Sequence, residues 1–295
     1  MAQIAIVGVG AIGSVAAASL EQTGQHELTL CVRRPLARLT VERATGPVEV
    51  RAAVATDPAT APAVDWILIA TKAYDAAGAG GWLERLRSRG APVAILQNGV
   101  EHRERFAPYA PAGSLLPAMV DCPAERDAPE RVRQRGPMLL RVPDSRDGRA
   151  FVELFAGTDV DAAVTADFTT TIWRKLCGNS AGIISALVLR ATEVMNDEAI
   201  AEVAREIVRE CVAVGRAEGA QLDDNVPDDV VAAYRSAPPD SLNSLHADRL
   251  AGRPMEIDAR NGAIVRLGRK HGIPTPYNRM AVALLEAVPA RPILS

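Results

Sequence analysis

Lys175 and Asn179 lie four residues apart in an otherwise apolar stretch, and this pair is the part of the chain best suited to chemistry. At that spacing the two side chains share one face of a helix. An ammonium group partly withdrawn from water has a lowered pKa, so it can donate a proton near neutral pH if a carboxylate steadies it. The alternative is that Lys175 runs along an amphipathic helix and reaches solvent.

A later segment holds a candidate for that carboxylate. Ser244 and Asp248 share a helical face, and the chain then passes through Pro254 to Glu256. Pro254 is typical of a helix start, which would place Glu256 in the first helical turn, where the helix dipole favours negative charge. The helix dipole alone would explain an acidic residue at position 256, yet it does not exclude an interaction between Glu256 and Lys175.

The chain begins with a strand pattern and a glycine-rich turn. Gln3 to Val7 is a short apolar run, and Gly8-Val9-Gly10-Ala11-Ile12-Gly13 leads from it into an alanine-rich helical stretch. In such a turn the glycines allow a tight bend, a close approach to a pyrophosphate and close packing of the helix on the strand. The free N–H groups at the helix start attract phosphate. We interpret the segment as a dinucleotide-binding turn, with a purely structural glycine turn as the alternative.

The residues after the second predicted strand indicate which dinucleotide is bound. Arg33 and Arg34 follow the apolar run from Leu28 to Val32, about 20 residues beyond the last glycine, where an NAD-binding chain has an acidic residue for the ribose 2′-hydroxyl. A guanidinium can instead bind a 2′-phosphate with two hydrogen bonds. We therefore predict NADP(H) as the cofactor, with two ordinary surface arginines as the alternative.

Two polar segments follow later strand patterns. Thr71-Lys72-Ala73-Tyr74 ends one predicted strand, and Gln97-Asn98-Gly99 ends the next. Both fall at the carboxyl edge of the predicted sheet, where doubly wound folds bind their ligands. Taken singly, each has an ordinary explanation as a tight turn or a solvated chain end. Their shared edge favours a functional role.

Alternating strand and helix patterns occupy the first half of the chain, and apolar strands of this kind belong in a parallel sheet covered on both faces. The predicted strands of that sheet are Gln3–Val7, Leu28–Val32, Val48–Val54, Val64–Thr71 and Pro92–Gln97. Hairpin-joined strands are expected to extend the sheet at 114–122, 131–134 and 138–142. A helix at 149–156 and a short strand at 160–164 complete this half.

From Asp167 onward, helical spacing replaces the strand patterns. Long helices are predicted at Phe168–Leu189, Asp197–Glu218 and Met255–Lys270, the last stopped by Gly272 and Pro274. The chain is thus predicted to be an α/β protein, with an N-terminal Rossmann-type doubly wound sheet in residues 1–166. An all-helical C-terminal domain for substrate binding and catalysis would follow in residues 167–295.

Composition and charge argue against several functional classes. The 295 residues carry a net charge of −3 without a dense run of Lys and Arg, which argues against binding nucleic acid or an anionic membrane. The four scattered cysteines are interpreted as reduced thiols, and the four scattered histidines give a metal site little support. No apolar run has the length to span a bilayer, and no basic leader precedes the first strand. We therefore expect a cytoplasmic protein.

The order and spacing of these motifs resemble the ketopantoate reductase family, also called 2-dehydropantoate 2-reductases, along nearly the full chain. The residues that carry the resemblance are Gly8, Gly10, Gly13, Arg33, Lys72, Gln97-Asn98-Gly99, Lys175-Leu176, Asn179, Ser244, Asp248, Gly252-Arg253, Glu256-Ile257-Asp258 and Asn261-Gly262. The resemblance implies NADPH-dependent reduction of a 2-oxo acid to a 2-hydroxy acid, with the substrate held between a Rossmann domain and a helical domain.

The resemblance also implies individual roles. Lys175 would be the general acid that protonates the forming alkoxide, and Glu256 would hold the substrate or Lys175 in place. The implied cofactor contacts are Gly8, Gly10, Ala11, Ile12, Gly13, Arg33, Lys72 and Asn98. The implied substrate contacts are Asn98, Asn179 and Ser244.

Two departures from the family pattern concern the substrate. The family usually has a second Asn four residues past Asn179, where this chain has Ile183, and it often has Ser where this chain has Asn243. An apolar side chain cannot bond a substrate hydroxyl, and leaving a buried hydroxyl unmatched costs about 1–3 kcal/mol. Ile183 therefore makes a 2-oxo acid with a more apolar tail than ketopantoate a second hypothesis.

Other classes of protein also remain open. One is another hydroxyacid or opine-type dehydrogenase, and a second is a non-catalytic NADP-binding regulator. Pairing of the predicted helices between two subunits would give a homodimer.

Overall fold

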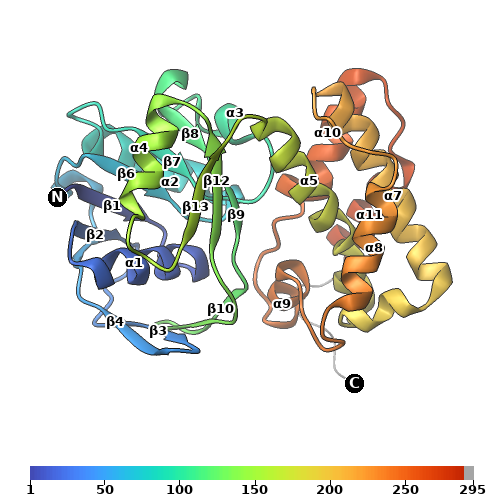
Figure 1. The fold of residues 1–295 in the computed structure, drawn as a ribbon, viewed down its shortest axis with the longest axis horizontal. Helices are drawn as coiled ribbons and strands as arrows, with labels where there is room; N and C mark the ends of the chain where they lie inside the picture. The colour runs from blue at the N-terminus through green and yellow to red at the C-terminus, as the bar shows by residue number, and fades with distance from the viewer. Residues whose placement is uncertain (289–295) are drawn as a thin grey trace. The chain divides into compact units, whose positions relative to one another are not determined.

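The computed structural model describes residues 1–288 and divides into two compact units. Unit 1 comprises Met1–Gln97 and Glu101–Phe168, and unit 2 comprises Asn98–Val100 together with the chain from Thr169 onward. Unit 1 is drawn in blue to green in Figure 1, and unit 2 mostly in yellow to red. Residues 289–295, the end of the predicted helical domain, lie outside the described residues.

A six-stranded sheet forms the centre of unit 1, and every neighbouring pair of its strands is parallel. The order is β5-β2-β1-β6-β7-β8, so the winding reverses between β1 and β6, the place where doubly wound sheets bind nucleotides. This confirms the predicted Rossmann-type sheet. Its strands are β1 Gln3–Val7, β2 Glu27–Cys31, β5 Ala53–Ala55, β6 Trp66–Ile69, β7 Val93–Ile95 and β8 Leu115–Pro117.

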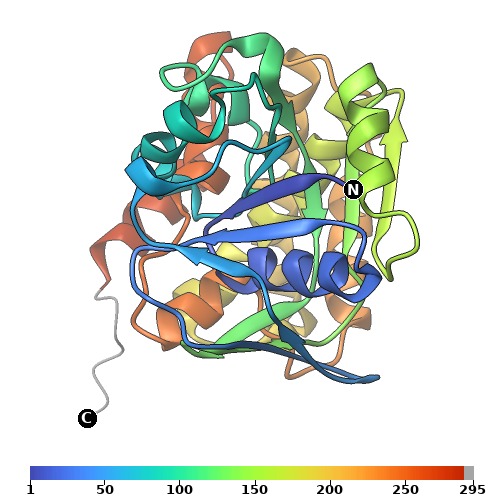
Figure 2. The same cartoon turned by 90° about the vertical axis from the view of Figure 1, so that its left-hand side faces the viewer.

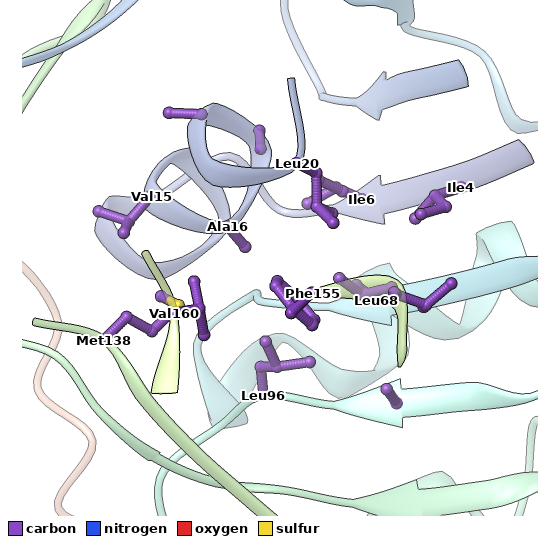
Figure 3. Close-up of a cluster of buried hydrophobic side chains, with 14 of the residues drawn as sticks. Ile4, Ile6, Val15, Ala16, Leu20, Leu68, Leu96, Met138, Phe155 and Val160 are labelled. Carbon is purple, nitrogen blue, oxygen red and sulfur yellow. The ribbon is translucent and has the colours of Figure 1, made fainter. Parts of the chain in front are cut away.

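Helix α1 (Ala11–Thr23) covers one face of the sheet, as Figure 2 shows for unit 1. Successive residues of a strand point to opposite faces, so Ile4 and Ile6 lie on the same side. They belong to a buried cluster with Val15 and Leu20 of α1, and Figure 3 shows Leu20 beside Ile6. Three alanines of α1, Ala16 to Ala18, are also buried in this cluster, and their small side chains help the helix to lie close to the sheet.

The opposite face of the sheet carries a second buried cluster. Ala5 and Val7, the alternate residues of β1, pack there with Leu83 and Phe106. Because both faces are covered at the centre of the sheet, β6 and β7 are apolar and buried throughout, as predicted. The covering helices of this face are α2 Ala76–Leu86 and α3 His102–Phe106.

Two smaller sheets replace the predicted extension of the main sheet. Of the segments expected to extend it, only β8 does so. A three-stranded sheet contains β9 Met119–Asp121, β12 Leu139–Pro143 and β13 Asp161–Thr165, with α4 Arg146–Leu154 between the last two. A four-stranded sheet contains β3 Leu39–Arg43, β4 Gly46–Val50, β10 Ala124–Ala128 and β11 Arg131–Gln134.

The predicted single strand at Val48–Val54 was wrong. The chain forms β4 and β5 there, in two different sheets, with Arg51 and Ala52 between them. Strand β3 was not predicted, although it forms a hairpin with β4 directly after it; its other partner, β11, lies far along the chain.

Unit 2 contains helices and no strand within residues 169–288, which confirms the predicted helical character of this region. The helices are α5 Phe168–Ala181, α6 Ile183–Val188, α7 Glu198–Ala217, α8 Val226–Ser236, α9 Ser244–Leu250, α10 Ala263–His271 and α11 Pro276–Ala287. A 3₁₀ segment at Thr192–Asn196 and a π-helical segment, η5, at Asp258–Gly262 complete the unit.

The helix predicted over Phe168–Leu189 is interrupted at Gly182, which separates α5 from α6. Side chains supply hydrogen bonds to carbonyl oxygens near this break: Tyr234 Oη donates to the Gly178 oxygen over 3.1 Å, and Asn243 Nδ2 donates to the Gly182 oxygen over 2.9 Å. A Cβ at position 182 would lie 2.7 Å from Tyr234 Oη, so the close approach requires glycine. These contacts anchor the helix that carries Lys175.

The predicted helix start at Met255 was also wrong. Helical structure begins with η5 at Asp258, so Glu256 lies in the irregular segment before it and not in a first helical turn. The helix dipole therefore does not explain Glu256, which is 5% exposed. The predicted stop is confirmed, since α10 ends at His271 and Gly272 follows in the left-handed region with φ 68°.

Candidate active site

The glycine turn combines two packing glycines with one that faces open space. Gly8 has φ 95°, and a Cβ there would lie 2.6 Å from atoms of Thr71, while a Cβ on Gly13 would lie 2.1 Å from the Gly8 oxygen. Gly10 differs, because nothing lies within 4 Å of its Cβ position. It is the N-cap of α1 and gives that helix no side-chain cap. The open N-terminus of α1 therefore suits a pyrophosphate.

Lys72 lies beside this turn at the carboxyl edge of the sheet. The Gln97 amide at the end of β7 donates to both the carbonyl and the hydroxyl oxygen of Thr71, each over 3.0 Å. Gly8 packs against the same Thr71. The ends of three neighbouring strands are thus joined around Thr71, and the half-buried Lys72 follows directly.

Arg33 lies past the end of β2, next to the strand that leads into the glycine turn. Its guanidinium is 3.6 Å from the carboxylate of Asp75, which follows β6, and its side chain is 84% exposed. An ion pair this exposed contributes little to stability. The arrangement instead leaves the Arg33 guanidinium accessible at the sheet edge.

A chain of side-chain hydrogen bonds in unit 2 joins three of the predicted site residues. Asn98 Nδ2 donates to Glu256 Oε2 over 3.1 Å, and Asn179 Nδ2 donates to Asn98 Oδ1 over 3.3 Å. A carboxylate oxygen accepts hydrogen bonds, so it sets which end of the Asn98 amide faces it. Asn98 then orients the Asn179 amide in the same way. This Glu256–Asn98–Asn179 chain links three of the predicted residues by direct side-chain hydrogen bonds.

Gly99 explains how Asn98 reaches this position. It has φ 103°, and a Cβ there would lie 2.6 Å from the carbonyl oxygen of Ala259 in η5. A side chain at position 99 would hold the segment away from η5. The glycine therefore allows Asn98–Val100 to join unit 2 directly after β7 ends.

Lys175 lies on α5 one helical turn before Asn179, so the two side chains share a face of that helix. Lys175 is half-buried. Ser244 is the first residue of α9 and is exposed, with Asn243 as the N-cap that accepts hydrogen bonds from the next backbone N–H groups. Ile183, in contrast, is fully buried in α6.

Sequence reasoning missed one residue that contacts this group. Arg260, in η5, donates from Nη1 to the Ser244 hydroxyl over 3.1 Å and from Nη2 to the carbonyl oxygen of Asn179. The available signal was a lone arginine in the otherwise uncharged stretch from Ala259 to Val265. An arginine in such a stretch is expected to be buried only where other groups accept its hydrogen bonds or balance its charge.

Other kinds of site receive no support from the described residues. Within residues 1–288 no group of three or more His, Cys, Asp or Glu side chains is arranged to hold a metal ion. In the same range no helix has the length and apolar character needed to cross a membrane. The four cysteines are free thiols.

The sheet order, the open glycine turn and the helical second unit together define a nucleotide-binding α/β protein with a polar site on its helices. Comparison with known families agrees with this class. The model described as Ketopantoate reductase PanE/ApbA matches residues 4–146, and the one described as Ketopantoate reductase PanE/ApbA C terminal matches residues 167–289. The chain therefore belongs to the ketopantoate reductase family.

Individual relatives cover almost the whole chain. A 2-dehydropantoate 2-reductase from Caulobacter vibrioides is 51% identical over 97% of this chain and 99% of its own length. One from Mycobacterium tuberculosis is 42% identical over 96% of this chain and 97% of its own length. The crystal structure of a PanE/ApbA family ketopantoate reductase from Ralstonia eutropha has a TM-score of 0.88 and 30% identity, covering 96% of this chain and 97% of that one.

We predict that Gly10→Ala and Gly8→Ala will behave differently. Alanine at position 10 has an ordinary φ of −82° and free space, so the melting temperature should stay near the native value while dinucleotide affinity falls. Alanine at position 8 needs a left-handed φ, which costs about 1–2 kcal/mol before its clash with Thr71 is counted, so the melting temperature should drop. Thermal unfolding and fluorescence titration measure both. Native affinity in Gly10→Ala would contradict this view of the turn.

Proposed function

We propose that this protein is an NADPH-dependent reductase that converts 2-dehydropantoate, or a closely related 2-oxo acid, to the 2-hydroxy acid. The observation that carries the proposal is the Glu256–Asn98–Asn179 hydrogen-bond chain on the helical face that bears Lys175, in a member of the ketopantoate reductase family. The 2-dehydropantoate 2-reductases that are 51% and 42% identical support the choice of substrate.

Lys175 is the general acid in this proposal. Reduction of a ketone leaves negative charge on its oxygen, and the ammonium of Lys175 stabilises that charge and donates the proton from Nζ. Its position one turn before Asn179 places it on the same face of α5 as that amide.

The Glu256–Asn98–Asn179 chain orients the amides that meet the substrate. Glu256 is buried and accepts from Asn98, so the direction of each amide is set before a ligand arrives. Asn179 donates to Asn98 and so turns its own Oδ1 away, as an acceptor for a substrate hydroxyl. Groups oriented in advance need no rearrangement during the reaction.

The residues of unit 1 hold the cofactor. The open N-terminus of α1 at Gly10 receives the pyrophosphate, and Arg33 and Lys72 supply positive charge at the sheet edge for the 2′-phosphate and the rest of the nucleotide. NADPH, when bound, supplies the hydride. The alanines and glycines of the turn allow the backbone to approach closely.

The hypothesis of a more apolar substrate has less support than 2-dehydropantoate. It was motivated by Ile183, but this side chain is fully buried in α6 and packs among protein atoms. A residue without exposed surface gives no evidence for an apolar wall around a substrate. Use of apolar 2-oxo acids therefore stays a prediction, as does a homodimer.

The function is tested by following NADPH absorbance with a panel of 2-oxo acids. We expect the highest kcat/KM with 2-dehydropantoate and lower values with branched apolar 2-oxo acids. The reverse order would favour the more apolar substrate. Absence of NADPH oxidation with every member of the panel, in a protein that still binds NADPH, would instead favour a non-catalytic regulator.

Lys175→Ala is predicted to lower kcat while leaving NADPH affinity unchanged. Loss of a general acid typically costs about 10²–10⁴-fold in rate. Arg174→Ala is the matched control, because it removes the neighbouring positive charge from an exposed side chain. A kcat within a few-fold of native in Lys175→Ala would remove the acid role from this residue.

Arg33→Ala is predicted to weaken NADPH binding much more than NADH binding. A charged hydrogen bond contributes about 1.5–3 kcal/mol, so the dissociation constant for NADPH should rise roughly 10- to 100-fold. Arg34→Ala controls for the loss of one exposed arginine from the same segment. Equal losses for both dinucleotides in Arg33→Ala would rule out a specific contact with the 2′-phosphate.

A further inference from the structure

Arg260 is a buried cation whose hydrogen bonds all go to neutral groups. Arg260 is 1% exposed. Its Nη1 donates to the Ser244 hydroxyl and its Nη2 to the Asn179 carbonyl oxygen, while its Nε has no hydrogen-bond partner. Among the described residues, no carboxylate forms an ion pair with it at 4 Å or less. Buried charges are normally paired, so this one is incompletely compensated by the protein.

Acidic side chains near Arg260 attract its positive charge, but they lie beyond ion-pair distance. Burial lowers the pKa of the guanidinium, and the Tyr234, Glu256 and Asp248 side chains oppose that effect. An arginine nevertheless remains protonated in proteins. The positive charge is therefore permanent and is held behind the face that carries Asn179 and Ser244.

The contact with Ser244 determines what that hydroxyl can do. A guanidinium only donates hydrogen bonds, so the Ser244 oxygen accepts from Arg260 and its own proton points elsewhere. Arg260 is buried and Ser244 is exposed, so the hydroxyl proton is directed toward the accessible side. The oxygen keeps one lone pair, but its proton is free to be donated, and the buried positive charge behind it favours a ligand that presents an acceptor, above all an anionic one.

The local packing is built to keep Arg260 in this position. A Cβ on Gly182 would lie 3.1 Å from Arg260 Nη2, so the break between α5 and α6 makes room for the guanidinium. Tyr234 and Asn243 donate to neighbouring carbonyl oxygens of the same break. The guanidinium therefore lies against Gly182 and is held by its own hydrogen bonds to Ser244 and to the Asn179 carbonyl oxygen.

We propose that Arg260 is a positioning residue that makes the site selective for a carboxylate, by turning the Ser244 proton outward and placing a fixed positive charge behind it. This inference rests on the function proposed above. In this inference, the Ser244 hydroxyl donates its hydrogen bond to the carboxylate of the 2-oxo acid. The competing view is that Arg260 only braces the carbonyl oxygen of Asn179.

The two views differ for a substrate that lacks the charge. The methyl ester of the same 2-oxo acid keeps the ketone and loses the negative charge of the carboxylate. Its rate of reduction therefore measures effects of a variant other than the attraction between that charge and Arg260. Arg260→Met should lower kcat/KM for the acid about 10- to 100-fold more than for the ester, mainly through KM, because the ester has no carboxylate for the charge to attract. Arg260→Lys keeps a positive charge and should retain part of the preference for the acid.

Arg249→Met is the matched control. Arg249 is also buried in unit 2, also has an unbonded Nε, and donates to the carbonyl oxygens of Ala186 and Leu187. Its loss should affect acid and ester alike. If Arg260→Met does not fold, the exposed Ser244→Ala variant carries the test, because it should also lose the preference for the acid over the ester.

The outcomes separate the two proposals. If the native enzyme reduces the acid and Arg260→Met or Ser244→Ala keeps the native ratio of acid to ester, the role of Arg260 is overturned and the proposed function stands. If the native protein reduces neither compound, the proposed function fails and the role of Arg260 falls with it. If the ratio of kcat/KM for the acid to that for the ester falls in Arg260→Met but not in Arg249→Met, the role of Arg260 in selecting a carboxylate is established.

Discussion

The hydrogen bond that Asn98 donates to the buried Glu256 carboxylate is the contact on which the candidate site depends. It sets the direction of the Asn98 amide, which sets that of Asn179, one helical turn from Lys175. Arg260 bonds the backbone of the same Asn179 and the hydroxyl of Ser244. The segments that carry Asn98, Asn179, Ser244 and Glu256 are therefore joined in one polar arrangement, with the Glu256 carboxylate setting the direction of the two amides and Arg260 donating to the Ser244 hydroxyl and the Asn179 carbonyl oxygen.

Much of unit 1 could be predicted from the sequence because its signals are local. The glycine turn, the apolar strands β1, β6 and β7, and the polar residues at their carboxyl ends each follow from a few neighbouring residues. The smaller sheets were not predicted: β3 pairs with β11 across about 90 residues of chain, which no local pattern reveals, and the local hairpin of β3 with β4 was missed. Alternation of apolar residues identifies a strand but does not identify its partner.

The site in unit 2 shows the same limit. Residue type and spacing singled out Lys175, Asn179 and Glu256 as candidates, yet the explanation of Glu256 by a first helical turn was wrong, because the helix begins after it. Arg260 was missed altogether. Its importance comes from what surrounds it in space, including the interruption at Gly182, and the sequence marks it only as one charged residue in an uncharged stretch.

The membership of Asn98–Val100 in unit 2 has a consequence for the evolution of this chain. The helical half does not contain all of its own polar site, since one member is encoded between two strands of the other half. Recombination that exchanged the halves at their apparent boundary would separate Asn98 from the Glu256 with which it was selected. The two halves are therefore expected to have been inherited and to have diverged as one module.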